Sequence, residues 1–347
     1  MNHPSILLIY TGGTIGMMQD PETLALKPYN FSQIIEEVPA LKKFGYTLDT
    51  YSFNPLIDSS DVNVDFWIRL SNLIKEKYEL YDGFVVLHGT DTMSYSASAM
   101  SFMLQDLEKP IIFTGSQLPI GMLRTDGKEN LISSIEIAAT KGPDGHSIVP
   151  EVCVYFETYL YRGNRTTKYN AENFRAFRSA NYPVLADTGI HIKYMTQNIR
   201  YPKIWGKKLK IASHLDTNVL VIKVIPGLKP EILDYILHAK GLRAVILETY
   251  GSGNAPTRKE FLEPIKKAID KGIIILNVSQ CHAGRVDMAA YEAGITLKNT
   301  GVISGDDITL EAALCKLYYL LGQSKENENI KSLLEKNISG EISKKLV

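Results

Sequence analysis

The 347-residue chain contains 45% hydrophobic and 22% charged residues, which is typical of an ordinary globular protein of one or two domains. Its 38 lysines and arginines balance its 38 aspartates and glutamates, so no field of one sign favours a nucleic-acid or membrane partner. No apolar run approaches the roughly 20 residues of a membrane span.

The N-terminal segment and the cysteines carry further expectations. Residues 1–5 (MNHPS) contain no lysine or arginine before a short apolar run, so we expect no signal peptide. The three cysteines show neither a disulfide framework nor a zinc spacing, which fits a reducing cytoplasm. Cys281 and His282 are adjacent, but one such pair does not make a metal site, so we expect no metal.

The first predicted element is a strand over residues 6–10 (ILLIY) that leads into the Gly-rich turn of residues 11–16 (TGGTIG). A short apolar run bounded by glycines is typical of a strand buried on both faces in a parallel sheet. Gly12 and Gly13 allow a sharp turn and a close ligand. Thr14 follows the carboxyl end of this strand, where open α/β sheets bind ligands, so its hydroxyl is a candidate nucleophile.

Two other interpretations of this turn are open. Thr14 is also suited to cap a helix or to face solvent. A nucleotide site fits the sequence less well, because residues 11–16 match neither GxGxxG nor GxxxxGK[ST]. Residues 50–53 (TYSF), near the end of the second strand, also lack the acidic residue that a dinucleotide site needs.

Helices and strands alternate through the first half of the chain. Residues 17–30, with Pro21 and Pro28, are expected to form a loop that folds over the Thr14 turn. Apolar residues at helical spacing predict helices, and apolar runs bounded by glycine or proline predict strands. The predicted helices are 65–78, 94–107 and 131–139, and the predicted strands are 83–87, 110–114 and 152–156. The methionines of the second of these helices are interpreted as core residues.

This alternation predicts an α/β fold, with a doubly wound parallel sheet in an N-terminal catalytic domain at residues 1–195. Residues 196–214, which contain the basic cluster Lys207, Lys208 and Lys210, are expected to be an exposed linker. A smaller α/β domain is expected at residues 215–347. Its predicted strands are 219–225, 244–247 and 273–278, and its predicted helices are 230–239, 259–271 and 310–321, followed by a polar helical tail from residue 324.

Right-handed crossovers place the carboxyl ends of parallel strands at one edge of a sheet. We therefore expect the Thr14 turn, the turn at residues 58–61 (DSSD) and the turn at residues 88–92 (HGTDT) to converge. Residues 161–168 (YRGNRTTK), which end in Lys168, follow a further strand. Hydroxyls, carboxylates and a lysine at one sheet edge favour a site that cleaves an amide or an ester.

Each of these motifs also has a structural interpretation. The turn at residues 58–61 is a suitable N-cap for the helix at Asp65, and residues 90–92 (TDT) for the helix at Ser94. Arg162 and Arg165 are also compatible with plain surface cations.

Residues 11–16 and 87–92 (LHGTDT), together with 114–117 (TGSQ), 161–168 and 250–256 (YGSGNAP), carry a family resemblance over nearly the whole chain. In these motifs and in their order, the chain resembles the type I, cytoplasmic L-asparaginases of the bacterial asparaginase/glutaminase superfamily. The resemblance implies hydrolysis of L-asparagine to L-aspartate and ammonia in the cytoplasm, without a cofactor or metal. It also implies a homodimer or homotetramer, with the second domain completing a neighbour's site.

The resemblance further implies a role for each motif. Thr14 is the nucleophile that forms a β-aspartyl ester, which water then hydrolyses. Thr90, Asp91 and Lys168 match the family's second catalytic set, and a buried lysine can accept a proton from a hydroxyl or from water. Which threonine attacks, and which residue takes its proton, stays open.

The substrate-binding residues follow from the same resemblance. Ser59 suits the α-carboxylate of the substrate and Asp91 its α-ammonium group, while backbone N–H groups of the turns suit the oxyanion. The full predicted set is Asp58, Ser59, Ser60, Thr90 and Asp91.

The chain departs from the family pattern at two places. Many relatives carry a tyrosine in the loop beside the nucleophile, but residues 23–28 (TLALKP) contain none, and Tyr29 follows too late to match. Tyr291 is one possible substitute. Some relatives also bind asparagine as an effector through an arginine where this chain has Glu248, whose carboxylate would repel the effector's carboxylate. We therefore expect no activation by asparagine.

Three other functions are compatible with parts of the sequence. A related glutaminase, or an amidotransferase subunit acting on aminoacylated tRNA, is the first, but a tRNA partner favours a basic surface and the net charge here is zero. A nucleotide-binding module lacks its phosphate fingerprint. A structural or scaffold role does not explain why two threonine motifs lie at one edge of the predicted sheet.

Overall fold

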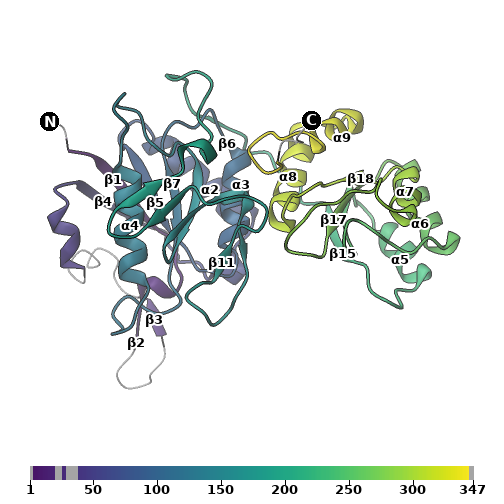
Figure 1. Cartoon of the computed structure of the whole chain (residues 1–347), viewed down its shortest axis with the longest axis horizontal. Coiled ribbons are helices and arrows are strands. Elements are labelled where there is room, and N and C mark those ends of the chain that lie inside the picture. The colour runs from purple at the N-terminus through teal and green to yellow at the C-terminus, as the bar shows by residue number, and fades with distance from the viewer. Residues whose placement is uncertain (1–2, 20–25, 29–37, 344–347) are drawn as a thin grey trace. The chain divides into compact units, whose positions relative to one another are not determined.

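The computed structural model describes residues 3–19, 26–28 and 38–343, and these fall into two compact units (Figure 1). Unit 1 comprises Met1–Ser179 and Pro183–Ser213, and unit 2 comprises Ala180–Tyr182 and His214–Val347. Residues 196–213 are thus grouped with unit 1. The expected domain limits stay a prediction.

Unit 1 is built on an eight-stranded sheet in the order β13-β12-β9-β8-β7-β5-β1-β4. The strands are β1 (Ser5–Tyr10), β4 (Thr47–Ser52), β5 (Gly83–Leu87), β7 (Ile111–Thr114), β8 (Val152–Phe156), β9 (Tyr159–Arg162), β12 (Ala186–Thr188) and β13 (Ile192–Tyr194). The five strands from β4 to β8 in this order pair in parallel, so the predicted doubly wound α/β fold is confirmed. Strands β9, β12 and β13 pair antiparallel and extend the sheet beyond the prediction.

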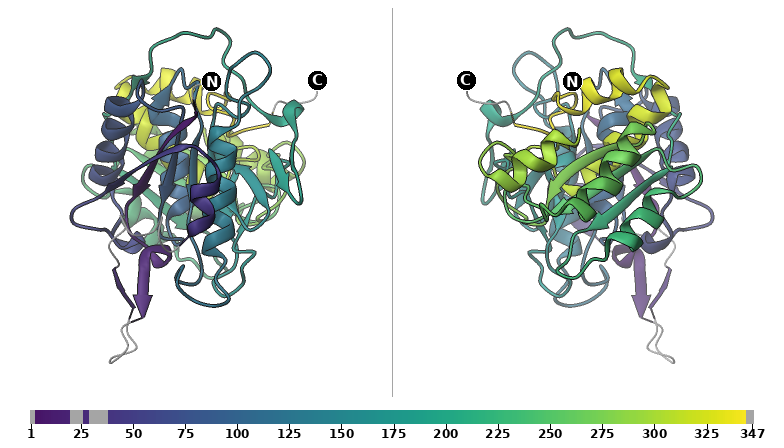
Figure 2. Two further views of the ribbon diagram at one scale, coloured as in Figure 1. Left: turned by 90° about the vertical axis from the view of Figure 1, so that its left-hand side faces the viewer. Right: turned by 90° about the vertical axis from the view of Figure 1, so that its right-hand side faces the viewer.

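Helices cover both faces of this sheet (Figure 2). Every residue of β5, β7 and β8 is buried, and strands of this kind need an apolar layer on each side. Helix α4 packs on β1, β5, β7 and β8, while α3 packs on β7 and β8. The methionines of α3 lie in the core, as predicted. The helices are α2 (Val64–Lys77), α3 (Met93–Met103) and α4 (Gly127–Ala139).

The strand order places a ligand-binding position at the end of β1. Strand β1 lies between β4 and β5, and the chain leaves β1 toward one neighbour and returns to the other. In doubly wound sheets this reversal opens a crevice at the carboxyl ends of the strands. The turns that begin at Thr11 and at His88 follow β1 and β5, so they flank this crevice.

The structure corrects several local predictions in unit 1. Residues 17–30 contain the paired strands β2 (Met17–Gln19) and β3 (Leu26–Pro28), so the expected loop is wrong over these two segments. Residues 20–25 and 29–30 of the expected loop lie outside the described residues. The expected helix 94–107 ends at Met103, because β6 (Leu104–Gln105) pairs with β14 (Lys210–Ile211). The remaining short elements are η1 (Thr14–Gly16), η3 (Pro39–Lys43), η4 (Ser59–Asp61), η5 (Gly163–Arg165), β10 (Thr167–Lys168), β11 (Phe177–Arg178) and η6 (Thr196–Asn198).

Unit 2 contains a four-stranded parallel sheet in the order β15-β16-β17-β18. One hydrophobic cluster lies between this sheet and α5, α6 and α7, and a second lies between the sheet and α8 and α9. The smaller α/β unit was predicted. Its elements are β15 (Val219–Lys223), α5 (Pro230–Leu237), β16 (Ala244–Thr249), α6 (Lys259–Asp270), β17 (Ile274–Ser279), α7 (Glu292–Asn299), β18 (Ile303–Ser304), α8 (Leu310–Gln323) and α9 (Asn327–Leu334).

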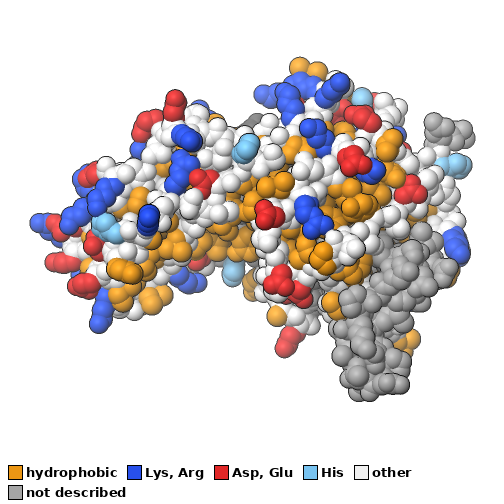
Figure 3. Space-filling view, turned by 180° about the vertical axis from the view of Figure 1, so that it is seen from behind, with side chains coloured by type: hydrophobic (Ala, Val, Ile, Leu, Met, Phe, Trp, Pro, Cys, Tyr) orange, Lys and Arg blue, Asp and Glu red, His pale blue; other side chains and the backbone are white. Residues whose placement is uncertain are grey.

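The face of the described residues in Figure 3 shows no large field of one sign. Basic and acidic side chains are interspersed over the face in Figure 3, in agreement with the balanced composition. None of the described helices combines the length and the apolar composition that a bilayer span requires. Within the described ranges, no three His, Cys, Asp or Glu side chains group as a metal site would need.

Candidate active site

Three turns of unit 1, those of Gly13, Ser59 and Gly89, meet at Gly89. A Cβ added to Gly13, which has a φ of 91°, would lie 2.5 Å from the Cα of Gly89. A Cβ added to Gly89 would lie 2.6 Å from the Oγ of Ser59. Side chains at either glycine would push the turns apart, since real Cβ contacts are essentially never this short. Thr14 and Thr90 each follow one of the two touching glycines, so the structure brings their backbones together as predicted from the topology.

Hydrogen bonds between the turns hold this arrangement. Both the N–H and the hydroxyl of Thr11 donate to the carbonyl of Leu87, at 3.0 and 2.9 Å. The hydroxyl of Thr92 donates to the carbonyl of Ser59 at 2.6 Å. Thr92 occupies the N-cap position of α3 but makes no side-chain cap bond there. Its hydroxyl therefore joins two turns and does not cap the helix, contrary to the structural interpretation of residues 90–92.

Lys168 lies at the centre of the polar contacts. Its Nζ donates to Oγ1 of Thr90 at 2.8 Å and to Oδ1 of Asp91 at 2.6 Å. The Lys168 side chain is 18% exposed and that of Asp91 is 64% exposed, so the pair sits at the rim of the protein. A lysine beside a hydroxyl can exchange a proton with it, which is the arrangement that general acid–base chemistry requires.

Gln117 connects this group to two further segments. Its Nε2 donates to the carbonyls of Ala171 (3.0 Å) and Asn173 (3.3 Å), so its Oε1 is left to accept from the Thr90 hydroxyl at 3.4 Å. The backbone N–H of Gln117 donates to both carboxylate oxygens of Asp126. Burial raises the pKa of Asp126, and the N–H donors from Gln117 oppose that rise.

The turn at residues 58–61 forms η4 and is capped by its own first residue. The carboxylate of Asp58 accepts from the N–H and from the hydroxyl of Ser60, each at 2.8 Å. These bonds, the backbone one first, hold the pKa of Asp58 below its usual value. The N-cap of α2 is Asn63, so the interpretation of this turn as a cap for that helix is wrong. Ser59 is buried and faces Gly89.

Two buried arginines precede Lys168. Nε of Arg162 donates to Glu151 at 2.6 Å, with side-chain exposures of 6% and 7%. A second nitrogen of Arg162 donates to the carbonyl of Asn198 at 2.9 Å. Arg165 is also buried, so the interpretation of both arginines as surface cations is wrong. The ion pair anchors the end of β9, from which η5 leads to Lys168.

The structure therefore joins Thr90, Asp91 and Lys168 by direct contacts and brings Thr14 and Ser59 to them through Gly13 and Gly89. The functional assignments of these residues, and those of Asp58 and Ser60, stay predictions. Residues 23–25 and Tyr29, where the tyrosine question arises, lie outside the described residues. Gln117 lies in a motif of the family resemblance but was not predicted as a site residue, because an amide side chain alone carries no chemical signal.

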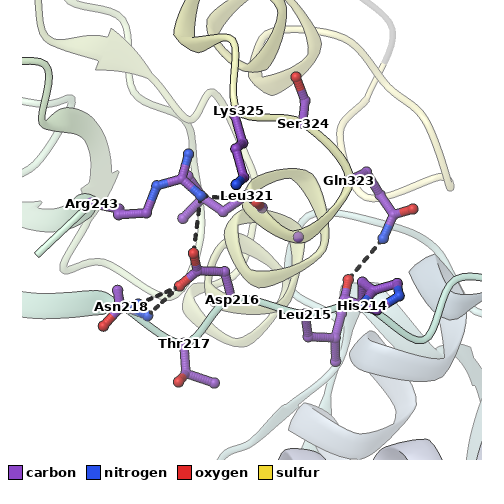
Figure 4. Close-up of a pocket in the computed structure, with 11 residues that line it drawn as sticks. His214, Leu215, Asp216, Thr217, Asn218, Arg243, Leu321, Gln323, Ser324 and Lys325 are labelled. Atoms are coloured by element: carbon purple, nitrogen blue, oxygen red, sulfur yellow. Dashed lines mark hydrogen bonds and ion pairs between the residues drawn. The ribbon is translucent and has the colours of Figure 1, made fainter. Parts of the chain in front are cut away.

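A pocket elsewhere brings together none of the predicted residues. It has a volume of about 480 Å³ in unit 2 and is lined by residues 214–218, Arg243 and the end of α8 (Figure 4). Its carboxylate is already engaged, since Asp216 accepts from Arg243 at 2.9 Å and from Asn218 at 2.8 Å. We therefore place the candidate site at the sheet edge of unit 1.

A doubly wound sheet with a glycine-packed threonine turn, and a threonine, aspartate and lysine in contact at the same edge, defines an α/β enzyme of the amide- or ester-cleaving class. Family comparison makes this class specific. A model described as "Asparaginase, N-terminal" matches residues 5–200, and one described as "Glutaminase/Asparaginase C-terminal domain" matches residues 218–334. The chain belongs to the asparaginase family.

Individual relatives agree with this membership. The chain is 40% identical to L-asparaginase 1 of Escherichia coli K12, over 99% of each protein. It is 37% identical to the 60 kDa lysophospholipase of Mus musculus, over 97% of this chain and 62% of the mouse protein. The crystal structure of L-asparaginase I from Vibrio cholerae superposes with a TM-score of 0.88 at 37% identity, covering 98% of this chain and 99% of that one.

Proposed function

We propose that the protein hydrolyses L-asparagine to L-aspartate and ammonia. Membership of the asparaginase family supports the reaction, and full-length likeness to proteins named L-asparaginase supports the substrate. The contact of Lys168 with Thr90 and Asp91, beside the Gly13–Gly89 packing, carries the proposal, because it puts two hydroxyl-bearing turns and a proton-handling side chain at one sheet edge.

The proposed nucleophile is the hydroxyl of Thr14. Its oxygen attacks the side-chain carboxamide carbon of asparagine, the C–N bond breaks, and the NH2 group leaves as ammonia with the proton of the hydroxyl. A β-aspartyl ester remains on Thr14. Water then attacks the same carbon, releases aspartate and returns a proton to the threonine oxygen. Splitting one difficult displacement into two in this way is the usual benefit of a covalent intermediate.

Thr90, Lys168 and Asp91 are proposed to move the protons of both steps. Lys168 exchanges a proton with the Thr90 hydroxyl, 2.8 Å away, and Asp91 stabilises its charged form at 2.6 Å. A positioned acid–base group of this kind contributes about 10²- to 10⁴-fold to the rate. The backbone N–H of Thr90 is a candidate donor to the oxyanion, and such a donor is worth roughly 3 kcal/mol.

The proposed substrate-binding residues surround the same point. Ser59, buried against Gly89, suits the α-carboxylate of the substrate. Asp91, whose side chain is largely exposed, suits the α-ammonium group. Asp58 and Ser60 are proposed to act by shaping the turn, since they bond to each other. A pocket for a four-carbon amino acid disfavours glutamine, although one methylene is worth only about 1–3 kcal/mol.

Three finer features belong to the same proposal. We propose a cytoplasmic enzyme that self-associates as a dimer or tetramer, which light scattering coupled to size-exclusion chromatography tests. We also propose hyperbolic kinetics without activation by asparagine, because Glu248, at the end of β16, puts a carboxylate where an effector's carboxylate would need a cation. A sigmoidal rate curve abolished by substitution of Thr167 or Cys281 would contradict this second point.

Ammonia release from equal concentrations of L-asparagine and L-glutamine tests the main proposal. We expect release from asparagine by the wild type, none by Thr14→Ala, and full release by the control Thr196→Ala, which removes an exposed hydroxyl of unit 1. Release that survives in Thr14→Ala would move the nucleophile to Thr90 or to water. A folded wild type that releases ammonia from neither amide would overturn the proposed substrate.

A further inference from the structure

A chain of three buried side chains ends at the point where the catalytic turns meet. Nε1 of Trp67 donates to Oγ of Ser96 at 2.9 Å, and Ser96 bonds to Nε2 of His88 at 2.9 Å. The other ring nitrogen of His88, Nδ1, contacts the carbonyl oxygen of Gly89 at 2.7 Å. All three side chains are buried, and none belongs to the nucleophile or to the proton-handling group proposed above.

The direction of every hydrogen bond in this chain is determined. A carbonyl oxygen only accepts, so Nδ1 of His88 carries a proton and donates to Gly89. Burial lowers the pKa of His88 to about 4, so the ring is neutral near pH 7 and Nε2 holds a lone pair. Ser96 must then donate its hydroxyl proton to Nε2 and accept from the indole N–H of Trp67. No proton of the chain is free to transfer.

Packing holds the imidazole in this orientation. The rings of Phe66 and Phe113 lie against His88 in edge contacts, with centroids 5.5 and 5.9 Å away. The backbone of His88 is fixed as well, because its N–H donates to the carbonyl of Thr114 at 2.9 Å and a Cβ on Gly115 would lie 2.4 Å from its carbonyl oxygen. The ring therefore offers one donor in one direction, toward Gly89.

Fixing the carbonyl of Gly89 fixes the N–H of Thr90. The two groups belong to one planar trans peptide and point in opposite directions. Since the carbonyl points at the buried imidazole, the N–H of Thr90 points away from it. Among the described residues, no hydrogen bond from the Thr90 N–H to a protein acceptor is found, so this donor is available to a ligand.

We infer that His88 is a positioning residue, which acts as a neutral Nδ1–H donor to hold the Gly89–Thr90 peptide so that the Thr90 N–H faces the reacting carbonyl. Ser96 and Trp67 set the tautomer that makes this possible. The inference rests on the proposed function, because it gives the Thr90 N–H its oxyanion role. It differs from a catalytic role for His88, since the imidazole touches no substrate and exchanges no proton.

Two variants of His88 separate positioning from mere packing. In His88→Asn the amide Nδ2 can take the place of imidazole Nδ1 and donate to Gly89, whereas His88→Leu has no donor. With asparagine as substrate we expect kcat to fall about tenfold or more in His88→Leu, with KM changed less than about twofold, because an oxyanion donor acts mainly in the transition state. His88→Asn should recover most of the lost kcat. The control His191→Leu removes an exposed histidine of unit 1 and should match the wild type.

The melting temperatures of both variants accompany the kinetics. A loss of kcat that follows the melting temperature across the two variants, or a folded His88→Leu with the kcat of the wild type, overturns the inference. Nitrogen-15 NMR of the histidine rings provides a readout that does not depend on substrate. An Nδ1–H tautomer for His88 agrees with the inference, and an Nε2–H tautomer overturns it. Wild-type protein that hydrolyses no amide contradicts the proposed function instead, and the NMR result still decides the tautomer.

Discussion

Each unit contains a lysine that forms a short ion pair with a carboxylate, and the two pairs differ in everything around them. Lys168 lies 2.6 Å from Asp91, with side-chain exposures of 18% and 64%. Lys316 lies 2.7 Å from Glu341, and both side chains are fully buried. Lys168 also donates to the hydroxyl of Thr90. The Lys168–Asp91 pair therefore contacts a hydroxyl that can exchange a proton and is partly exposed to solvent, and we call it the open pair. The Lys316–Glu341 pair is closed to solvent, and we call it the closed pair.

Both members of the closed pair, Lys316 and Glu341, also form hydrogen bonds with backbone groups. Nζ of Lys316 also donates to the carbonyls of Leu334 (2.9 Å) and Lys336 (2.6 Å), while Glu341 accepts from backbone N–H groups at Ile338 and Ser339. Burial lowers the pKa of Lys316, and Glu341 opposes that shift. These contacts fasten the segment after α9 to α8. The comparison teaches that a lysine–carboxylate pair marks a reactive site only where its third partner can lose a proton.

The largest effect is expected from a substitution that breaks the open pair. Lys168→Met should lower kcat for asparagine by about 10²- to 10⁴-fold, because it removes the proposed acid–base group. The unfolding free energy should change by less than about 1 kcal/mol, since ion pairs with an exposed partner contribute little. Stopped-flow ammonia assays and urea titration measure the two quantities. Lys141→Met, which breaks the pair of Lys141 with Asp82 at 2.7 Å, away from the proposed site, is the control, and equal activity in both variants would refute the distinction.

The reverse pattern is expected for the closed pair. Lys316→Met leaves the Glu341 carboxylate buried without its partner, so the unfolding free energy should fall by about 3–5 kcal/mol. The activity of the protein that stays folded should be unchanged. Urea titration with an activity assay at each concentration checks this. Lys331→Met, which breaks an exposed pair with Glu328 in the same unit, should cost below about 0.5 kcal/mol, and a similar cost for both variants would argue against the difference in burial.

These two pairs also show what the sequence could predict. Apolar runs followed by glycine and threonine predicted the parallel strands and the convergence of their ends, because buried parallel strands have that composition. The turns of Thr14 and Thr90 were therefore predicted to converge, while the grouping of Lys168 with Thr90 and Asp91 followed from the family resemblance. The pairing of Lys316 with Glu341 was not predictable, since charged residues are expected at the surface unless a partner far along the chain is known.

The remaining misses have related causes. Arg162 and Arg165 carry the charge of surface residues, and only the fold shows that the first is neutralised by Glu151. Strands β12 and β13 contain three residues each, too few for a hydrophobic period. The strands of residues 17–19 and 26–28 were missed for the same reason.

A pH series extends the comparison to His88, a buried titratable side chain of unit 1. Its pKa is about 4 in the folded protein and about 6.5 in an unfolded chain. Between these values the unfolded chain binds a proton that the folded protein does not. The unfolding free energy should therefore fall as the pH is lowered from 6.5 to 4, by about 1.4 kcal/mol per pH unit and roughly 3 kcal/mol in all. Above pH 6.5 this contribution is constant.

Urea titrations of the wild type and His88→Asn at several pH values isolate this effect, because the other titrating groups are common to both proteins. The wild type should lose more stability than the variant as the pH falls through this window. If the stability of the two proteins changed with pH in parallel, burial would not be what keeps His88 neutral.

The smallest effect is expected from substitution of Gln117, which accepts a hydrogen bond from the Thr90 hydroxyl beside the open pair. Gln117 presents Oε1 to the Thr90 hydroxyl because its Nε2 is committed to the carbonyls of Ala171 and Asn173. Gln117→Met keeps the volume but removes the acceptor, so the Thr90 proton loses its resting orientation. A net hydrogen bond of about 0.5–1.5 kcal/mol corresponds to at most about a tenfold fall in kcat.

The control for this substitution is Gln197→Met, at an exposed position of η6, and steady-state kinetics on asparagine compare the two variants. Gln117→Glu should be slower than Gln117→Met, because a carboxylate oxygen would replace Nε2 opposite two carbonyl oxygens. A faster Gln117→Glu would mean that Thr90 needs a base at this position. Lys168 would then share proton transfer with residue 117. The reactivity of the open pair would depend on the side chain at position 117 as well as on the Thr90 hydroxyl.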